Sequence, residues 1–423
     1  MKGKFFGYIF LCLGIFFLQE IWTSCSFRKN DTVIIWTNRR EFVSYAELFN
    51  ATNEDVKVLV VYKERPAESL PPAKDETPPD IVIGPWLTSN SVRKNFRPVD
   101  YLFSEQQINQ SAFYPKLLNT GNINDKQYLL PVSFNLPAVI FSEQNNSYVE
   151  ENYMLTIDQI RDKASTFNKT NKDGSYSKMG FAPSWNSDFL YLVAKIQGAS
   201  FSEQGELFSW NQAKMDSTVE YLRSWTETFN SATSVEQDFA FKYLYTPEYK
   251  QVATEKCLFA YTNSQELFSI PKEQLQNIDF RWIHQDLKIL VEDDMIFLGL
   301  HKQSKNSAGA EAFITWFMQE ETQGKLLDRT TSMGLNVESF GISGGFSAIR
   351  NVNERIFPLY YEHLQGNIPP AEYIDVVNIL PIRWESLKSR IVLPWLESYS
   401  DTKQEEVTAT MEALIDTWSK QFE

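Results

Sequence analysis

The sequence predicts an α/β protein with two domains and a cleft between them. A chain of 423 residues, 43% hydrophobic and 22% charged, is long enough for two domains with cores of their own. From residue 31 onward, short apolar runs typical of strands alternate with helical patterns. Two broken extended stretches, 128–141 and 280–300, have the pattern expected of a chain that crosses between domains.

The first residues read as a targeting segment rather than as part of the fold. Lys2 and Lys4 precede the apolar run Phe5–Leu18, which is short for a membrane span. A positive start followed by an apolar stretch of this length is typical of a signal peptide, which we place at residues 1–24.

The cysteines favour export without an internal disulfide. Cys25 follows small residues and resembles the acylated cysteine of bacterial lipoproteins, although Trp22 is unusual in that motif. We therefore expect lipidation at Cys25 and a lipidated tether over 25–30; an ordinary signal peptide with an incidental cysteine is the alternative. Cys12 lies in the removed segment, which leaves Cys257 without an intramolecular partner.

The charge limits the possible partners. The formal charge is −14, and the segment before Cys25 contributes +1, so the remainder carries about −15. This balance disfavours nucleic acid and anionic membrane surfaces, because both are negatively charged. We expect no nucleic-acid partner, and membrane attachment only through an N-terminal lipid.

The stretch Asp31–Arg40 contains the first strand and a polar, aromatic turn. Thr32–Ile35 is a β-branched run without alternation, as in a strand covered on both faces. Glu41–Asn50 then has its apolar residues at helical spacing. Because ligands bind at the carboxyl ends of strands in open α/β sheets, we expect the turn after residue 35 to face a cleft.

The later elements follow the same alternation. Strands are expected at 56–61 and 80–84, separated by an irregular excursion over 65–79. A polar break at Phe134–Pro137 divides the first crossing. Further strands are predicted at 257–261, 280–283, 288–291 and 295–300. Helices are predicted at 156–166, 187–198, 213–229, 246–256, 308–319, 357–364, 371–380 and 407–418.

Several segments, taken in order, resemble the extracellular (periplasmic) solute-binding proteins of ABC importers, in their carbohydrate-binding branch. The segments are VIIWTNRREFVSYAELFN, PDIVIGPW, YLLPVSFNLPAVIF, GFAPSWNSDFLYLVAKIQGASF, EKCLFAYTNSQELF and GLHKQSKNSAGAEAFITWFMQEETQGKLL. The resemblance implies the two-lobed type II periplasmic-binding-protein fold, with hinge strands and a central cleft. The lobes would comprise 31–134 with about 292–340, and 135–291 with about 341–423. Hinge motion is expected at 134–137 and near 288–295.

The resemblance also implies a function. The protein would be a monomer at the cell envelope that captures a small solute, a sugar or oligosaccharide, and delivers it to the membrane subunits of an ABC permease. It would be no enzyme and would use no cofactor or metal. The ligand-binding residues implied are Trp36, Asn38, Arg39, Trp86, Phe134, Asn135, Trp185, Asn186, Asp188, Tyr261, Asn263, Gly345 and Phe346.

These residue types suit a saccharide, whose apolar faces stack on aromatic rings and whose hydroxyls bond to amides and charged groups. We expect the rings of Trp36 and Trp185 to stack on the ligand. The pair Arg39 and Arg40 leaves open an anionic ligand instead.

The sequence contains few residue patterns that indicate a catalytic site. His284, His301 and His363 lie at unrelated spacings. The acidic run 292–294 could bind a cation, but three consecutive acids do not share a face, so the pattern favours a solvated bend. The glycine-rich GISGGFS at 341–347 reads as a turn. The alternatives that remain are a lipid-anchored glycosidase, whose paired carboxylates sequence cannot exclude, and a non-transport adhesin or structural lipoprotein.

Overall fold

The computed structural model describes residues 31–149, 153–334, 339–403 and 409–421. The predicted signal peptide, the lipidation site Cys25 and the tether lie outside the described residues. Among the helices described, none is both long and apolar enough to cross a bilayer.

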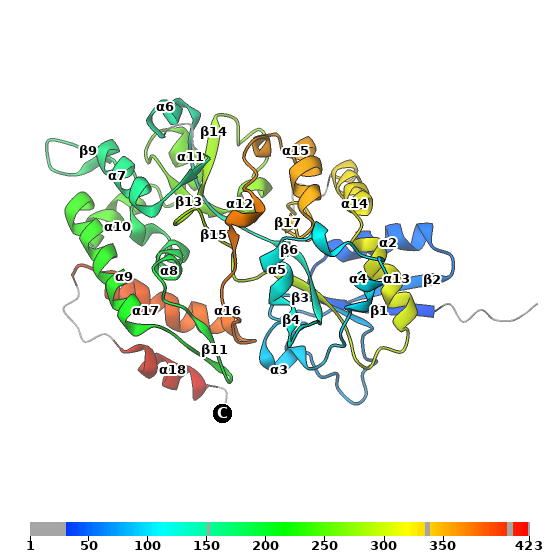
Figure 1. Ribbon diagram of the computed structural model, residues 1–423. Helices are drawn as coiled ribbons and strands as arrows, with labels where there is room; N and C mark the ends of the chain where they lie inside the picture. Colours follow the sequence, from blue (N-terminus) through cyan, green and yellow to red (C-terminus); the bar gives the residue numbers. More distant parts are fainter. Residues whose placement is uncertain (1–30, 150–152, 335–338, 404–408, 422–423) are drawn as a thin grey trace, which may run out of the picture.

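The first lobe is built on a mixed sheet, on the right in Figure 1. Within the described residues it has six strands in the order β17-β6-β16-β3-β1-β2: β1 (Asp31–Thr37), β2 (Val56–Tyr62), β3 (Ile81–Gly84), β6 (Leu129–Phe134), β16 (Ile296–Leu300) and β17 (Phe346–Ser347). β1 runs parallel to β2 and β3, whereas β16 runs antiparallel to β3 and β6. The carboxyl ends of β1 and β3 therefore lie side by side.

Helices cover this sheet through their aromatic residues. Phe42 and Phe49 of α2 (Glu41–Thr52) pack against Phe317 and Phe313 of α13 (Ser307–Phe317) at ring distances of 5.3 Å each. The same lobe holds α3 (Asn90–Arg93), α4 (Tyr101–Ser104), α5 (Pro115–Thr120), α14 (Glu320–Ser332), α15 (Phe357–Tyr360) and the short pair β4 (Asn122–Ile123) and β5 (Lys126–Gln127).

The second lobe, on the left in Figure 1, contains a smaller sheet. Its described strands follow the order β13-β7-β14-β8: β7 (Pro137–Ser142), β8 (Met154–Leu155), β13 (Ala260–Asn263) and β14 (Ile278–Ile283). Two hairpins project from it, β9 (Lys169–Thr170) with β10 (Tyr176–Lys178), and β11 (Ser202–Gln204) with β12 (Leu207–Ser209). Its helices are α6 (Asn146–Val149), α7 (Ile157–Phe167), α8 (Ser187–Ile196), α9 (Gln212–Trp225), α10 (Thr233–Lys242), α11 (Glu248–Ala253), α12 (Ser264–Ser269), α16 (Trp384–Leu387), α17 (Leu393–Ser400) and α18 (Met411–Ser419).

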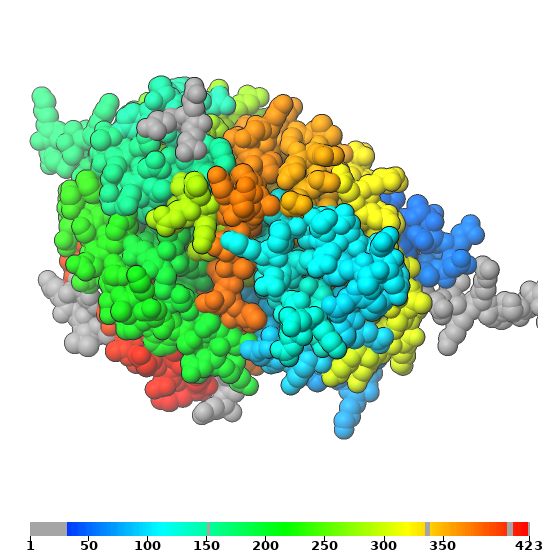
Figure 2. Space-filling model, viewed as in Figure 1, coloured from blue at the N-terminus to red at the C-terminus, as the bar shows by residue number. Residues whose placement is uncertain are grey.

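The chain crosses between the lobes at both predicted places. It leaves the first sheet at the end of β6 and enters the second at the start of β7, with Asn135 and Leu136 between them. It returns between β14 and β16 through β15 (Ile289–Leu290). A further crossing follows β17, where β18 (Ile374–Asp375) pairs in parallel with β15. In Figure 2 this orange segment lies between the cyan part of the first lobe and the green second lobe.

Two expectations about the last hundred residues are wrong. The segment 371–380 was expected to be a helix, but it holds a short 3-10 turn followed by β18, because its backbone pairs with β15. The second lobe was expected to take over from about 341, but β17 at 346–347 pairs with β6 of the first sheet.

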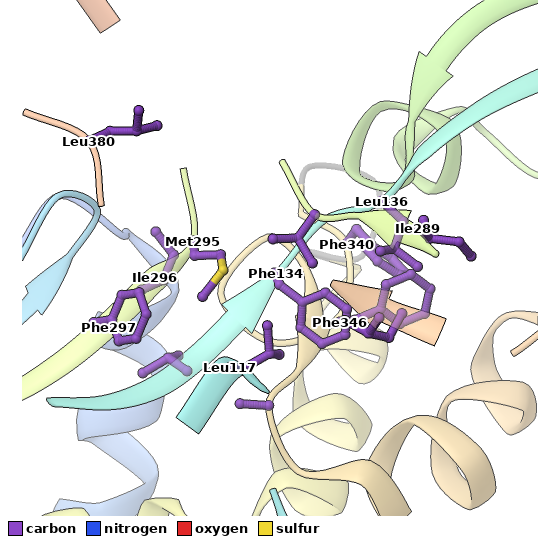
Figure 3. Packing of buried hydrophobic residues seen from close by; sticks show 14 of the residues in the cluster. Leu117, Phe134, Leu136, Ile289, Met295, Ile296, Phe297, Phe340, Phe346 and Leu380 are labelled. Carbon is purple, nitrogen blue, oxygen red and sulfur yellow. The ribbon is translucent and has the colours of Figure 1, made fainter. Parts of the chain in front are cut away.

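The lobes share an aromatic core at the crossings. Phe346 of β17 lies 5.8 Å from the ring of Phe134 and 5.8 Å from Trp282 of the second sheet. Figure 3 shows Phe134, Phe340 and Phe346 close together beside the crossing strands. Gly345 allows this packing, because a Cβ there would lie 2.7 Å from the Phe134 carbonyl oxygen.

Candidate functional site

The lobes enclose a cavity of about 490 Å³ at the crossings. The first lobe contributes the turns after β1 and β3, the crossings contribute Asn135 and residues 292–294, and the second lobe contributes β13 and the starts of α8, α12 and α16. The lining residues that the sequence predicted are Asn38, Arg39, Trp86, Asn135, Asn186, Asp188, Tyr261 and Asn263.

The turn after β1 brings two polar groups to the cavity with unused bonding capacity. Asn38 Oδ1 and Arg39 Nε are buried and have no hydrogen-bond partner among the described residues. Buried polar atoms are almost always bonded, so two unpartnered atoms are an unusual feature of this turn, which lines the cavity. Arg39 also reaches Asp294 at 3.5 Å.

The amides on the opposite wall are held by their own helices. Asn186 accepts hydrogen bonds from the backbone N–H groups of Asp188 and Phe189 and so caps α8. Asn263 caps α12 in the same way. Caps of this kind fix both side chains at the cavity wall and leave their amide N–H₂ groups as donors.

Trp86 is an aromatic residue that the sequence predicted to bind the ligand. It lines the cavity, and part of its surface is exposed. Its backbone has φ of 63°, a left-handed conformation that is rare for a bulky residue. Such strain costs on the order of 1–3 kcal/mol and is found most often at functional positions.

Five of the predicted binding residues do not line the cavity. Trp36 is 1% exposed and packs in the first core under the Lys63 ammonium group. Trp185 stacks on Phe239, and its indole N–H donates to the Glu236 carbonyl oxygen. Phe134, Gly345 and Phe346 belong to the shared core described above. Neither ring therefore faces this cavity. Trp185, which is half-buried, instead lines a smaller cavity with Asn186 and Tyr261. Stacking of these two rings on a ligand stays a prediction.

The acidic run 292–294 is the largest feature that sequence reasoning misjudged. It was expected to be a solvated bend, yet the Asp293 side chain is only 6% exposed. Its carboxylate accepts hydrogen bonds from the Tyr191 hydroxyl at 2.6 Å, the Trp384 indole N–H at 2.8 Å and the Lys195 ammonium at 3.0 Å. Burial alone would raise the pKa of Asp293, but Lys195 and Lys388 hold it below its usual value.

The C-terminal part of the cavity was also missed. Its residues are Trp384, Glu385, Lys388, Ser389 and Leu393. Lys388 donates to Asp188 at 2.6 Å and thereby ties the C-terminal segment to α8. The feature of the sequence that could have indicated this part of the cavity is Trp384, a tryptophan among polar residues. No neighbouring motif connects it to a binding site.

A second cavity of about 510 Å³ adjoins the first. The two share Asn38, Pro85, Trp86, Glu385 and Ser389, so Trp86 lies on the boundary between them. Further along, Glu68 lies 3.5 Å from both Arg65 and Arg383. Together the cavities form one groove with room for more than one ring of a ligand.

The thiol and imidazole groups discussed in the sequence analysis do not line the cavity. Cys257 is buried, and burial raises the pKa of its thiol. Burial likewise lowers the pKa of His284 and His301. Among the described residues no cluster of His, Cys, Asp and Glu fits a metal ion.

One contact joins the lobes across the groove beside Trp86. The Glu203 carboxylate, on β11, accepts hydrogen bonds from the Ser89 hydroxyl at 2.6 Å and from the backbone N–H of Asn90 at 2.9 Å. Ser89 in turn donates its backbone N–H to the Trp86 carbonyl oxygen. The contact thus connects the turn that carries Trp86 to the opposite lobe.

Replacing Glu203 with alanine is expected to favour an open arrangement of the lobes, because charge-assisted hydrogen bonds across the groove are lost. Small-angle scattering should show a larger radius of gyration, and affinity for a ligand held by both lobes should fall about tenfold. Glu206→Ala, in the exposed tip of the same hairpin, is the control. Equal scattering from both variants would contradict a role for this contact in closure.

Comparison with known proteins identifies the fold. No protein-family model and no curated protein matches the chain. Among solved structures, the sugar-binding protein MalE from Xanthomonas citri is similar over 92% of this chain and 96% of its own, with a TM-score of 0.64 and 12% identity. A sugar transporter from Rhizobium etli in an open conformation matches at 0.63 and 13%, over 92% and 98%.

An ABC substrate-binding protein from Listeria monocytogenes in complex with cycloalternan matches at a TM-score of 0.59 and 14% identity, over 92% of this chain and 97% of that one. These matches extend over both lobes. The chain therefore has the two-lobed α/β fold of these sugar-binding and substrate-binding proteins.

Proposed function

We propose that the protein captures a saccharide between its lobes and delivers it to the membrane subunits of an ABC importer. The observation that carries this proposal is the cavity at the lobe crossings, where polar side chains from both lobes converge beside Trp86. A ligand bound to both walls stabilises the closed arrangement in proportion to its differential affinity. Closure about the crossings then gives the permease a signal that the protein is loaded.

The proposal includes a setting for this function. Acylation of Cys25 would hold the protein in the bacterial cell envelope, on the periplasmic side or at the cell surface, as a monomer without a cofactor. Neighbours of the same fold are described as bound to mannotriose and to cycloalternan, which supports a saccharide as the ligand class. The adjoining second cavity favours an oligosaccharide over a single ring.

An anionic ligand, which the arginine pair left open, is less favoured. Arg39 already has a carboxylate partner in Asp294, and Arg40 is exposed at the start of α2. Carboxylates outnumber cations among the lining residues of the first cavity, which disfavours an anionic ligand there.

Thermal-shift measurements with neutral mono- and oligosaccharides, polyols and organic anions test the proposal. A saccharide at 100 times its Kd should stabilise the protein by about 2.7 kcal/mol, which is a shift of several degrees. Chromatography of the recovered ligand distinguishes capture from hydrolysis. Absence of any stabilising saccharide, or release of shortened products, would contradict the proposal.

A further inference from the structure

The interior of the cavity has an unbalanced charge. Among the described residues, three cations pair with carboxylates at this cavity. Arg39 lies 3.5 Å from Asp294, Lys195 lies 3.0 Å from Asp293, and Lys388 lies 2.6 Å from Asp188. A fourth carboxylate, Glu292, remains. Its nearest cation is Lys195 at 4.0 Å, which is already bonded to Asp293.

Glu292 is also poorly supplied with hydrogen bonds. Its side chain is 17% exposed, and the Tyr261 hydroxyl lies 3.3 Å from Oε1. The backbone fixes its position, because the N–H of Glu292 donates to the Asn135 carbonyl oxygen at the first crossing. Burial raises the pKa of Glu292, and the neighbouring Asp293 and Asp294 raise it further against the opposing effect of Lys195 and Lys388.

The rim of the cavity adds charge of the same sign. Glu266 of α12 and Glu385 of α16 are exposed lining residues. Carboxylates around an opening attract cations and repel anions before contact. A second negative charge placed beside Glu292 would be repelled, and the partly buried setting strengthens that repulsion relative to water.

From this geometry we propose that the cavity selects a saccharide that carries a protonated amino group, and that Glu292 pairs with it. This inference rests on the proposed function and assigns its substrate class. A neutral sugar can donate hydroxyls to Glu292 but leaves the buried charge uncompensated, whereas an ammonium group balances it. Asn38 and Asn186 line the same cavity as Glu292, so their amide groups are available to the hydroxyls of the ring.

Calorimetric titration with four matched disaccharides tests the inference: the β-1,4-linked glucosamine dimer, its N-acetylated form, cellobiose and a diuronate. We expect the amine to bind at least tenfold more tightly than cellobiose or the acetylated form, and the diuronate not to bind. In Glu292→Gln, which keeps the shape of the side chain, the preference should fall below threefold. Glu206→Gln, in an exposed hairpin tip that lines neither cavity, should retain the preference.

The pH dependence provides a readout that needs no variant. As the pH falls through the raised pKa of Glu292, the carboxyl becomes neutral, so the preference for the amine over cellobiose should shrink. Equal affinity for the amine and its acetylated form at neutral pH would overturn the inference and leave saccharide capture intact. If no saccharide binds, the proposed function fails as well.

Discussion

Replacing Asp293 with alanine is expected to lower the free energy of unfolding by about 3–5 kcal/mol. The variant leaves the Lys195 ammonium, only 5% exposed, without its closest carboxylate. It also removes the acceptor for the Tyr191 hydroxyl and the Trp384 indole N–H. Lys195 would keep only the Glu292 carboxylate, at 4.0 Å, and two buried donors would lose their acceptor. Changes of this kind are among the costliest that a single substitution makes.

Urea denaturation followed by circular dichroism gives the measurement. Asp294→Ala is the matched control, because that side chain is 45% exposed, and its loss should cost no more than about 1 kcal/mol. The double variant Lys195→Met with Asp293→Asn should recover part of the loss, since both members of the ion pair are then neutral. A cost for Asp293→Ala as small as that of the control would contradict the buried ion pair.

The same carboxylate predicts an acid dependence. The pKa of Asp293 is lowered in the folded protein, so its contribution to stability is present above the unfolded value of 3.8 and is lost as the pH falls through the folded value. The difference in unfolding free energy between wild type and Asp293→Asn should therefore shrink below about pH 4. A constant difference down to pH 2 would show that the charge is not what stabilises the crossing.

Replacing Trp86 with alanine is expected to weaken saccharide binding at least tenfold while the fold survives. The indole lies on the boundary of both cavities, where it can stack on a sugar ring, and such contacts contribute about 0.5–1.5 kcal/mol beyond the area that they bury. Its positive φ adds a second expectation. Trp86→Gly should be about 1 kcal/mol more stable than Trp86→Ala, because glycine adopts this conformation without strain.

Calorimetric titration and urea denaturation of both variants separate the two effects. Trp316→Ala is the control, since Trp316 is a half-buried tryptophan of α13 that packs on Phe49 and lines neither cavity. It should lose stability and keep affinity. Unchanged affinity in both Trp86 variants would mean that the ligand does not stack on this ring.

The sequence predicted elements and crossings better than it predicted side-chain direction. The runs at 56–61 and 80–84 became β2 and β3, and the helix predicted at 156–166 is α7, which Thr156 caps. The polar turns at strand ends reached the cavity because the carboxyl ends of adjacent parallel strands share one edge. The direction of a tryptophan side chain at such a strand end cannot be predicted in the same way. Trp36 is buried in the core, whereas Trp86, which follows a strand of the same sheet, lines the cavity.

What sequence could not supply were the contacts between distant segments. Three consecutive acids look solvated until Lys195, Tyr191 and Trp384 are brought around Asp293 from elements about 90 to 100 residues away. The pairing of β18 with β15 likewise overrides the helical pattern of 371–380. Contacts between segments far apart in the sequence cannot be predicted from the local spacing of apolar residues.

The third crossing has a consequence for biosynthesis. One wall of the groove comes from Asn38 and Trp86, and another comes from residues 384–393, so the pocket joins parts of the chain made at widely separated times. A growing chain can form β1 to β3 early, but the groove lacks one wall until residue 393 has been added. The saccharide binding proposed above therefore requires these late residues, and ligand added during synthesis should not rescue chains that stop before Trp384.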